Sequence, residues 1–234
     1  MGAIFRRELL AYFTTPIGYI FLALFYAGSG LFFNVTALDR GSANMASIFT
    51  LLIYVLLVAI PILTMRTLSE EKNQKTDQCL LTAPVSLGGL VMGKFLAAFL
   101  IYVMAVAITL VYAVVISAFA KPDWLVVTGN ITGFLLLGCA FIAIGIFVSS
   151  LTENQVVSAI ISFAAMLLCY LLSTIATMIP IEWLAKIIVG LSFVDRYTGF
   201  TYGLFDLSNA LFFISVTAVF LFLTVRVLEK RRWS

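Results

Sequence analysis

Residues 125–148 read LVVTGNITGFLLLGCAFIAIGIFV, a run without a single Asp, Glu, Lys or Arg. A helix that crosses a bilayer needs about 20 consecutive, mostly apolar residues, so this run predicts a membrane-spanning helix. Five more runs meet or nearly meet the same requirement: Ile17–Phe33, Ile48–Met65, Phe95–Phe119, Val156–Ile179 and Ala210–Val227. The sequence therefore predicts an all-α polytopic membrane protein, with six transmembrane helices in one domain over residues 1–234.

The composition of the 234-residue chain excludes an ordinary soluble domain. Hydrophobic residues make up 63% of it and charged residues 11%, whereas soluble domains average about 45–50% apolar and about 25% charged. There is no histidine, which excludes His-based acid–base catalysis and HExxH zinc sites. The 3 cysteines, Cys79, Cys139 and Cys169, form no CxxC pair, so we expect neither a metal site nor a disulfide framework.

The placement of the basic residues predicts the orientation of the spans. Ten Lys and Arg residues fall on the side that carries both termini, and four fall on the other side. Cytoplasmic loops are the ones enriched in Lys and Arg, so both termini are expected in the cytoplasm, without a cleavable signal peptide. No charged residue lies near the middle of a span, which argues against a proton-driven pump or antiporter.

Two segments outside the spans are expected to lie along the membrane surface. Residues 1–15 predict an amphipathic interfacial helix, after which Pro16 starts a new direction. Its apolar positions at helical spacing are Ile4, Phe5, Leu9, Tyr12 and Phe13. Pro180–Leu207 is too long for a hairpin turn and predicts one or two short helices that dip into the outer leaflet, packed within the protein.

Glycines recur at helical spacing in two places. Gly129–Gly133 lies near the start of the fourth span, and Gly199–Gly203 lies in the outer segment. Small residues four apart permit close contact between helices. We expect packing within one chain rather than a dimer seam.

Arg66–Lys94 is the longest polar segment and reads RTLSEEKNQKTDQCLLTAPVSLGGLVMGK. Ser69 is expected to cap a short cytosolic helix that Glu70 and Glu71 open, because carboxylates favour a helix N-terminus. Ser86 is expected to cap a second helix that enters the third span.

The end of this segment contains a G-x-x-x-x-G-K pattern at Gly88, Gly93 and Lys94. A phosphate-binding loop also needs Ser or Thr in the next position and a preceding strand, whereas Phe95 follows and a span begins. Nucleotide binding by this chain is therefore not expected. Lys94 is expected to mark the membrane boundary by snorkelling to the interface.

A short turn, SSLTENQ at Ser149–Gln155, joins the fourth and fifth spans. Thr152 is expected to cap the fifth span, with Glu153 in its first turn. A plain connecting turn is the alternative.

Three stretches resemble the permease subunits of type-2 ABC transporters, most closely the gliding-motility permease (GldF-like) group. They are R-T-L-S-E-E-K at Arg66–Lys72, T-x-x-x-L-L-T-A-P-V-S-x-x-x-x-V-x-G-K at Thr76–Lys94, and S-S-L-T-E-N-Q at Ser149–Gln155. The resemblance covers the whole chain, including the amphipathic start, the six spans and the outer segment.

The resemblance implies the membrane half of an ATP-driven transporter in a bacterial cytoplasmic (inner) membrane, an exporter by family habit. The chain itself would bind no cofactor and no metal and would have no catalytic residue, since ATP and Mg²⁺ would sit on two copies of a separate cytosolic ABC ATPase. A second permease chain, identical or related, would complete the transporter within the membrane lipid. An extracytoplasmic auxiliary subunit stays open, and no nucleic-acid partner is expected.

The resemblance also implies roles for particular residues. The N-terminal helix would be the family's connecting helix, which lies on the inner surface of the membrane. The coupling helix and the short turn would contact the ATPase through Glu70, Glu71, Lys72, Thr76, Leu80, Leu81, Pro84, Thr152, Glu153 and Asn154. Spans two and five would line a pathway between two protomers with the polar positions Thr50, Tyr54, Ser158, Ser162, Tyr170 and Thr174. A lining this apolar favours a lipid-like or amphipathic cargo over an ion.

Other classes of function remain as alternatives. A membrane scaffold or assembly subunit of cell-envelope or motility machinery could use the same ATPase contact without moving cargo. A secondary transporter is disfavoured by the missing midplane charges. An intramembrane enzyme is disfavoured because there is neither a histidine nor a pair of carboxylates at the membrane.

Overall fold

The computed structural model describes residues 2–38, 45–75, 86–119, 123–203 and 205–232. Within these ranges the chain is almost entirely helical and contains no strand. Six helical segments there are long and apolar enough to cross a membrane: Pro16–Ala37, Met45–Asn73, Leu87–Ser117, Trp124–Leu151, Gln155–Met178 and Leu207–Arg232. Each predicted span overlaps one of them, so the prediction of an all-α protein with six transmembrane helices is confirmed.

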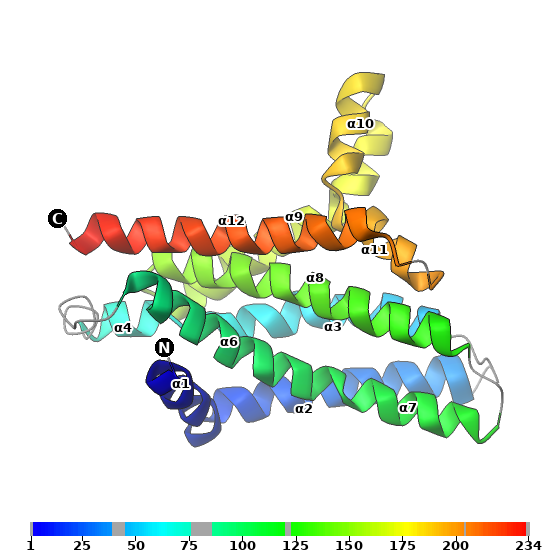
Figure 1. The fold of residues 1–234 in the computed structure, drawn as a ribbon, viewed down its shortest axis with the longest axis horizontal. Coiled ribbons are helices and arrows are strands. Elements are labelled where there is room, and N and C mark those ends of the chain that lie inside the picture. The colour runs from blue at the N-terminus through cyan, green and yellow to red at the C-terminus, as the bar shows by residue number, and fades with distance from the viewer. Residues whose placement is uncertain (1, 39–44, 76–85, 120–122, 204, 233–234) are drawn as a thin grey trace.

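The long helices are aligned along one axis, and both termini lie at the same end (Figure 1). The helices of the six spans are α2 (Pro16–Phe33), α3 (Met45–Thr64), α6 (Leu87–Val106) with α7 (Ile108–Ser117), α8 (Trp124–Leu151), α9 (Gln155–Met178) and α12 (Leu207–Arg232). A π-helical turn, η1 (Asn34–Leu38), extends α2. The short helix α4 (Ser69–Asn73) lies at the end that carries the termini.

Helix α8 is the centre of the bundle and packs against α3, α6, α9, α11 and α12. Glycines on α8 let its neighbours approach. A Cβ added at Gly138 would overlap the ring of Tyr102 on α6, and a Cβ at Gly145 would overlap Thr64 at the end of α3. The Tyr102 ring is fully buried, and its hydroxyl donates to the carbonyl of Phe134 at 2.6 Å. Close packing thus compensates for the absence of a hydrophobic driving force between helices in lipid.

The two predicted glycine pairs pack against neighbouring parts of the chain, and one glycine of each pair, Gly129 and Gly203, face each other. Helix α11 (Phe193–Thr201) crosses α8 where Gly129 faces the backbone of Gly203, and a Cβ at Gly129 would lie 3.0 Å from the Gly203 Cα. Gly203 has a φ of 73°, a left-handed conformation that favours glycine. The prediction that these glycines serve packing within one chain is therefore confirmed.

The outer segment forms two short helices with different surroundings. Phe193, Tyr197 and Phe200 of α11 are buried, as predicted for a helix packed within the protein. Helix α10 (Glu182–Gly190) instead projects sideways from the bundle (Figure 1), with Trp183 67% exposed. Helix α10 packs against α9, but Trp183, Ile187 and Leu191 on its predicted apolar face are exposed. For α10 the expectation of packing within the protein therefore holds only in part.

Arg196 holds α10 to the other outer elements. Its guanidinium donates to the carbonyl of Gly190, the last residue of α10, at 3.3 Å, and to Asn209 Oδ1 on α12 at 3.1 Å. A cation near the C-terminus of a helix also interacts favourably with the helix dipole. The projecting helix is thus fixed at its base.

We predict that Gly133→Ala destabilises the protein, because a Cβ there would lie 2.7 Å from Cβ and Cγ of Phe200. Overpacking of this kind costs about 1–3 kcal/mol, and thermal unfolding in detergent measures it. Gly88→Ala is the matched control, since a Cβ at that helical glycine meets nothing within 4 Å. Equal melting temperatures for the two variants would contradict the α8–α11 packing.

Candidate functional site

Helix α1 (Gly2–Thr14) lies at the end of the bundle that carries both termini, next to the start of α2 (Figure 1). The predicted N-terminal helix is thus present, with Phe5, Leu9 and Phe13 partly buried against the core. Pro16 occupies the first turn of α2, where its fixed φ suits a helix start. A Cβ at Gly18 would lie 2.5 Å from the carbonyl oxygen of Tyr12, so glycine is what permits this tight corner.

Tyr12 anchors α1 to the end of α3. Its side chain is 7% exposed, and its hydroxyl donates to the carbonyl of Leu63 at 3.2 Å. Burial raises the pKa of Tyr12 to about 12, so the phenol keeps its proton and remains a donor at neutral pH.

Helix α4 follows α3 after one turn, and its start is not built as the sequence predicts. The expectation that Ser69 caps α4 is wrong, since Leu68 occupies the N-cap position and the Ser69 hydroxyl donates back to the carbonyl of Met65. The backbone N–H groups of Leu68 and Ser69 instead donate to Ser149 Oγ, each at 3.1 Å. The cap is therefore supplied by the end of α8.

A buried lysine of α6 points toward α1 and α4. Lys94 is 1% exposed, and its Nζ lies 3.1 Å from Glu8 Oε1 and 2.8 Å from Glu71 Oε1. It also donates to the carbonyl of Thr67 at 2.8 Å. Lys94 therefore does not snorkel to the interface as predicted, because two carboxylates and a carbonyl solvate its ammonium inside the protein.

Arg7 completes this cluster from the outside. Its Nη2 lies 2.6 Å from Glu8 Oε1 and 2.8 Å from Glu71 Oε1, and the hydrogen bond that it donates to Glu8 raises the pKa of Arg7. We call Arg7, Glu8, Glu71 and Lys94 the four-charge cluster. Two cations and two carboxylates balance, which is the condition under which a charge is tolerated in the interior.

The glycine before Lys94 makes the cluster possible. A Cβ at Gly93 would lie 3.0 Å from Cγ2 of Ile4 on α1. The G-x-x-x-x-G-K pattern thus has a structural explanation: Gly93 brings α1 close to α6, and Lys94 then meets Glu8. Lys94 is enclosed within helix α6, which is not the geometry of a phosphate-binding loop.

The turn between α8 and α9 is joined to α4 and to α12. Lys72 Nζ lies 3.0 Å from Glu153 Oε1, and this hydrogen bond lowers the pKa of Glu153. Arg231 near the end of α12 donates to the carbonyl of Ser150 at 2.7 Å. The ends of α4, α8, α9 and α12 are therefore connected by polar contacts at one end of the bundle.

The sequence predicts the N-cap of α6 correctly and that of α9 incorrectly. Ser86 accepts from the Gly89 N–H at 3.3 Å and caps α6, as predicted. The cap of α9 is Asn154, whose Oδ1 accepts from Val156 N at 2.9 Å. The expectation that Thr152 caps α9 is wrong, since its hydroxyl donates back to the carbonyl of Val148 at 3.5 Å.

The residues expected to contact an ATPase fall into three groups. Glu70 pairs with Arg66, Glu71 with Lys94, and Lys72 with Glu153, so these three make contacts within the chain. Glu153 and Asn154 are exposed and Thr152 is half-buried. Thr76, Leu80, Leu81 and Pro84 lie outside the described residues.

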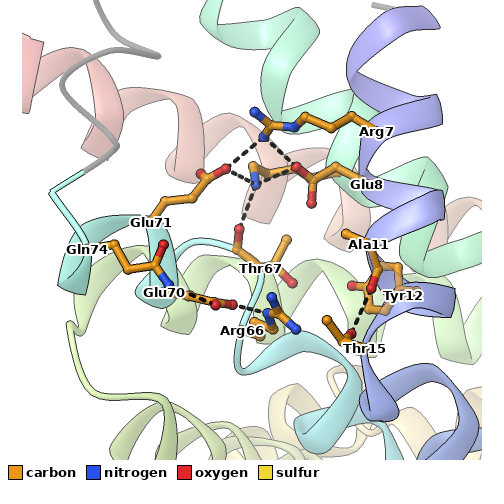
Figure 2. A pocket seen from close by; sticks show the side chains of 11 residues that line it. Arg7, Glu8, Ala11, Tyr12, Thr15, Arg66, Thr67, Glu70, Glu71 and Gln74 are labelled. Carbon is orange, nitrogen blue, oxygen red and sulfur yellow. Dashed lines mark hydrogen bonds and ion pairs between the residues drawn. The ribbon is translucent and has the colours of Figure 1, made fainter.

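A pocket of about 480 Å³ opens between α1 and the α3–α4 corner. Figure 2 shows the Arg66–Glu70 pair on one wall and Tyr12 with Thr15 on the opposite wall. The full lining comprises Arg7, Glu8, Ala11, Tyr12, Thr15, Arg66, Thr67, Glu70, Glu71, Gln74 and Lys94. Its lining contains equal numbers of basic and acidic side chains, and the charged contacts in it connect parts of the chain itself.

The positions expected along a pathway are only partly brought together. The hydroxyl of Tyr170 on α9 donates to that of Tyr54 on α3 at 2.8 Å, with the ring centroids 5.4 Å apart. Thr50 and Thr174 are exposed on the same two helices. Ser158 and Ser162 are fully buried, and their hydroxyls have no hydrogen-bond partner among the described residues.

Six helices long and apolar enough to cross a membrane define a multi-pass membrane protein. Ion pairs and hydrogen bonds connect several of these helices at the end that carries both termini. A family model described as ABC-2 family transporter protein matches residues 11–233. The chain therefore belongs to the ABC-2 family of transporter proteins, as a non-catalytic membrane component of the permease type. No curated protein matches the chain.

We predict that Lys94→Met strongly destabilises the protein, because Glu8 and Glu71 lose the ammonium that neutralises them. Removing one partner of a buried ion pair costs about 3–5 kcal/mol. Arg226→Gln is the control, since its pair with Glu229 is exposed and contributes less than about 1 kcal/mol. Thermal unfolding in detergent compares the two.

The reason for the loss is tested by a compensating variant. Adding Glu8→Gln and Glu71→Gln to Lys94→Met gives a triple variant without either carboxylate. We expect this variant to recover part of the stability that Lys94→Met loses. A triple variant no more stable than Lys94→Met alone would show that the charge balance is not what Lys94 supplies.

Proposed function

We propose that this chain is the permease subunit of an exporter, in which ATP hydrolysis by two copies of a separate cytosolic ABC ATPase is coupled to translocation across a bacterial cytoplasmic (inner) membrane. The observation that carries the proposal is the attachment of α4 to α1, α6 and α8 through the four-charge cluster and Ser149. A short helix held this firmly passes a displacement to the spans rather than absorbing it.

The surface that meets the ATPase is assigned to the exposed side chains at the end of α4 and in the turn beside it. Asn73, Gln74 and Lys75 at the end of α4 are exposed, as are Glu153 and Asn154 in the neighbouring turn. Glu70, Glu71 and Lys72 then position α4, while these exposed side chains supply the contact. ATP and Mg²⁺ belong to the ATPase.

The excess of Lys and Arg on the side of both termini supports a cytoplasmic location for α4. On that side α1 would lie in the headgroup plane, with its own Arg6 and Arg7 exposed. The sequence stretches quoted above favour the gliding-motility group within the family. The projecting α10 leaves an apolar surface for an extracytoplasmic auxiliary subunit.

The pathway is assigned to the face formed by α3 and α9. Helix α9 is the least buried of the six spans, and Tyr54, Tyr170, Thr50 and Thr174 give this face its polar groups. A second permease chain, identical or related, would close the pathway from the other side. The surrounding apolar surface favours a lipid-like or amphipathic cargo.

We predict that the chain co-purifies with its ABC ATPase as two permease and two ATPase subunits, measured by native mass spectrometry after co-expression. Combining Gln74→Glu with Lys75→Glu should lower the captured ATPase about tenfold, because both side chains are exposed at the end of α4. Lys186→Glu is the control, an exposed charge change in α10.

Each outcome has a distinct meaning. A wild-type chain that captures no ATPase contradicts the proposal. If the complex hydrolyses ATP in vesicles but moves no lipid-like probe, the chain is an ATPase-gated scaffold and not a transporter subunit. Equal capture by the α4 variant and the Lys186 variant shows that the exposed end of α4 is not the contact.

A further inference from the structure

The hydroxyl of Ser149 occupies an unusual position in the chain. Ser149 is fully buried near the end of α8. Its Oγ accepts hydrogen bonds from Leu68 N and Ser69 N at 3.1 Å each, and donates to the carbonyl of Met65 at 3.1 Å. A hydroxyl has one proton and two lone pairs, so all three are used, and all three partners belong to the corner between α3 and α4.

This corner has no side-chain cap of its own. The first N–H groups of a helix have no partner within it and are usually satisfied by a Ser, Thr, Asp or Asn at the N-cap. Leu68 occupies that position in α4 and offers no oxygen. The orphan donors of α4 and a carbonyl beyond the last residue of α3 are therefore satisfied together by one atom of α8.

The neighbouring serine shows that this is particular to position 149. Ser150 is equally buried, yet its hydroxyl donates to the carbonyl of Phe147 within α8 itself. Lys72 and Glu153 form a second link between α4 and the end of α8. That ion pair involves an exposed carboxylate and is screened by salt, so it constrains α4 weakly.

We propose that Ser149 is the positioning residue that makes α4 and the end of α8 move as one unit. The proposal rests on the proposed function, in which an ATPase displaces α4. Because bending the α3–α4 corner breaks three hydrogen bonds unless α8 follows, a displacement of α4 reaches α8 and, through the turn at 152–154, reaches α9. Ser149 thereby connects the ATPase contact to both helices of the assigned pathway face.

The first arm of the test uses the chain alone in lipid nanodiscs and measures hydrogen exchange of residues 65–73. We expect the amides of Leu68 and Ser69 to exchange about tenfold faster in Ser149→Ala, since their acceptor is removed. Ser150→Ala should exchange like the wild type. Equal exchange in the two alanine variants would overturn the proposal. Ser149→Cys, which keeps the size but weakens the hydrogen bonds, should be intermediate and serves if Ser149→Ala fails to fold.

The second arm uses the complex with the ATPase and compares exchange before and after trapping with ATP and vanadate. In the wild type, trapping should change exchange both in residues 69–73 and in residues 145–151 at the end of α8, which lie outside the assigned ATPase contact. In Ser149→Ala the change should persist in 69–73 and be lost in 145–151, whereas Ser150→Ala should behave like the wild type. A response in 145–151 that survives in Ser149→Ala would overturn the proposal, because a merely structural role predicts no such selective loss.

The two arms also separate this proposal from the proposed function. If the wild-type chain captures no ATPase, the proposed function fails, and the first arm alone decides whether Ser149 holds α4. If the ATPase binds and both arms show no difference between Ser149→Ala and Ser150→Ala, the coupling assignment stands and the role of Ser149 is wrong.

Discussion

The burial of one ammonium group constrains the whole end of the bundle that carries both termini. Lys94 is enclosed by α1, α4 and α6, and an unpaired charge in such a place would be strongly unfavourable. Glu8 and Glu71 must therefore both be in place for the end of α6 to be stable. Since these carboxylates lie on segments more than sixty residues apart in the sequence, α1 and α4 assemble with α6 as one cooperative unit.

The rest of the architecture fits this requirement. Gly93 on α6 lets α1 approach, and Gly138 and Gly145 on α8 let α6 and α3 approach. The contact at Gly145 brings the backbone of α8 close to that of the α3–α4 corner. Ser149 can then reach two N–H groups on another segment. Close packing between apolar helices and a polar network at their ends are thus two parts of the same construction.

Features that depend on a short stretch of chain could be predicted from the sequence. Hydropathy located the six spans, and Ser86 was identified as a cap because cap and helix are adjacent. The cap of α4 could not be predicted, since its acceptor, Ser149, is some eighty residues away. Lys94 was misjudged for the same reason: a lysine near the start of a span looks like a boundary marker until its carboxylate partners are known. The sequence indicates a helix start and an ATPase contact for Glu71 but gives no sign that it pairs with Lys94, and Glu8 gives no signal at all, because isolated charges beside apolar positions are common at helix surfaces.

The sideways projection of α10 gives the molecule unequal cross-sections along its length. The bundle stands alone at the level of α4, whereas α10, with its exposed Trp183, lies against α9 nearer the other end. A molecule that approaches the bundle from this flank therefore meets α10 before it reaches the centre of the bundle.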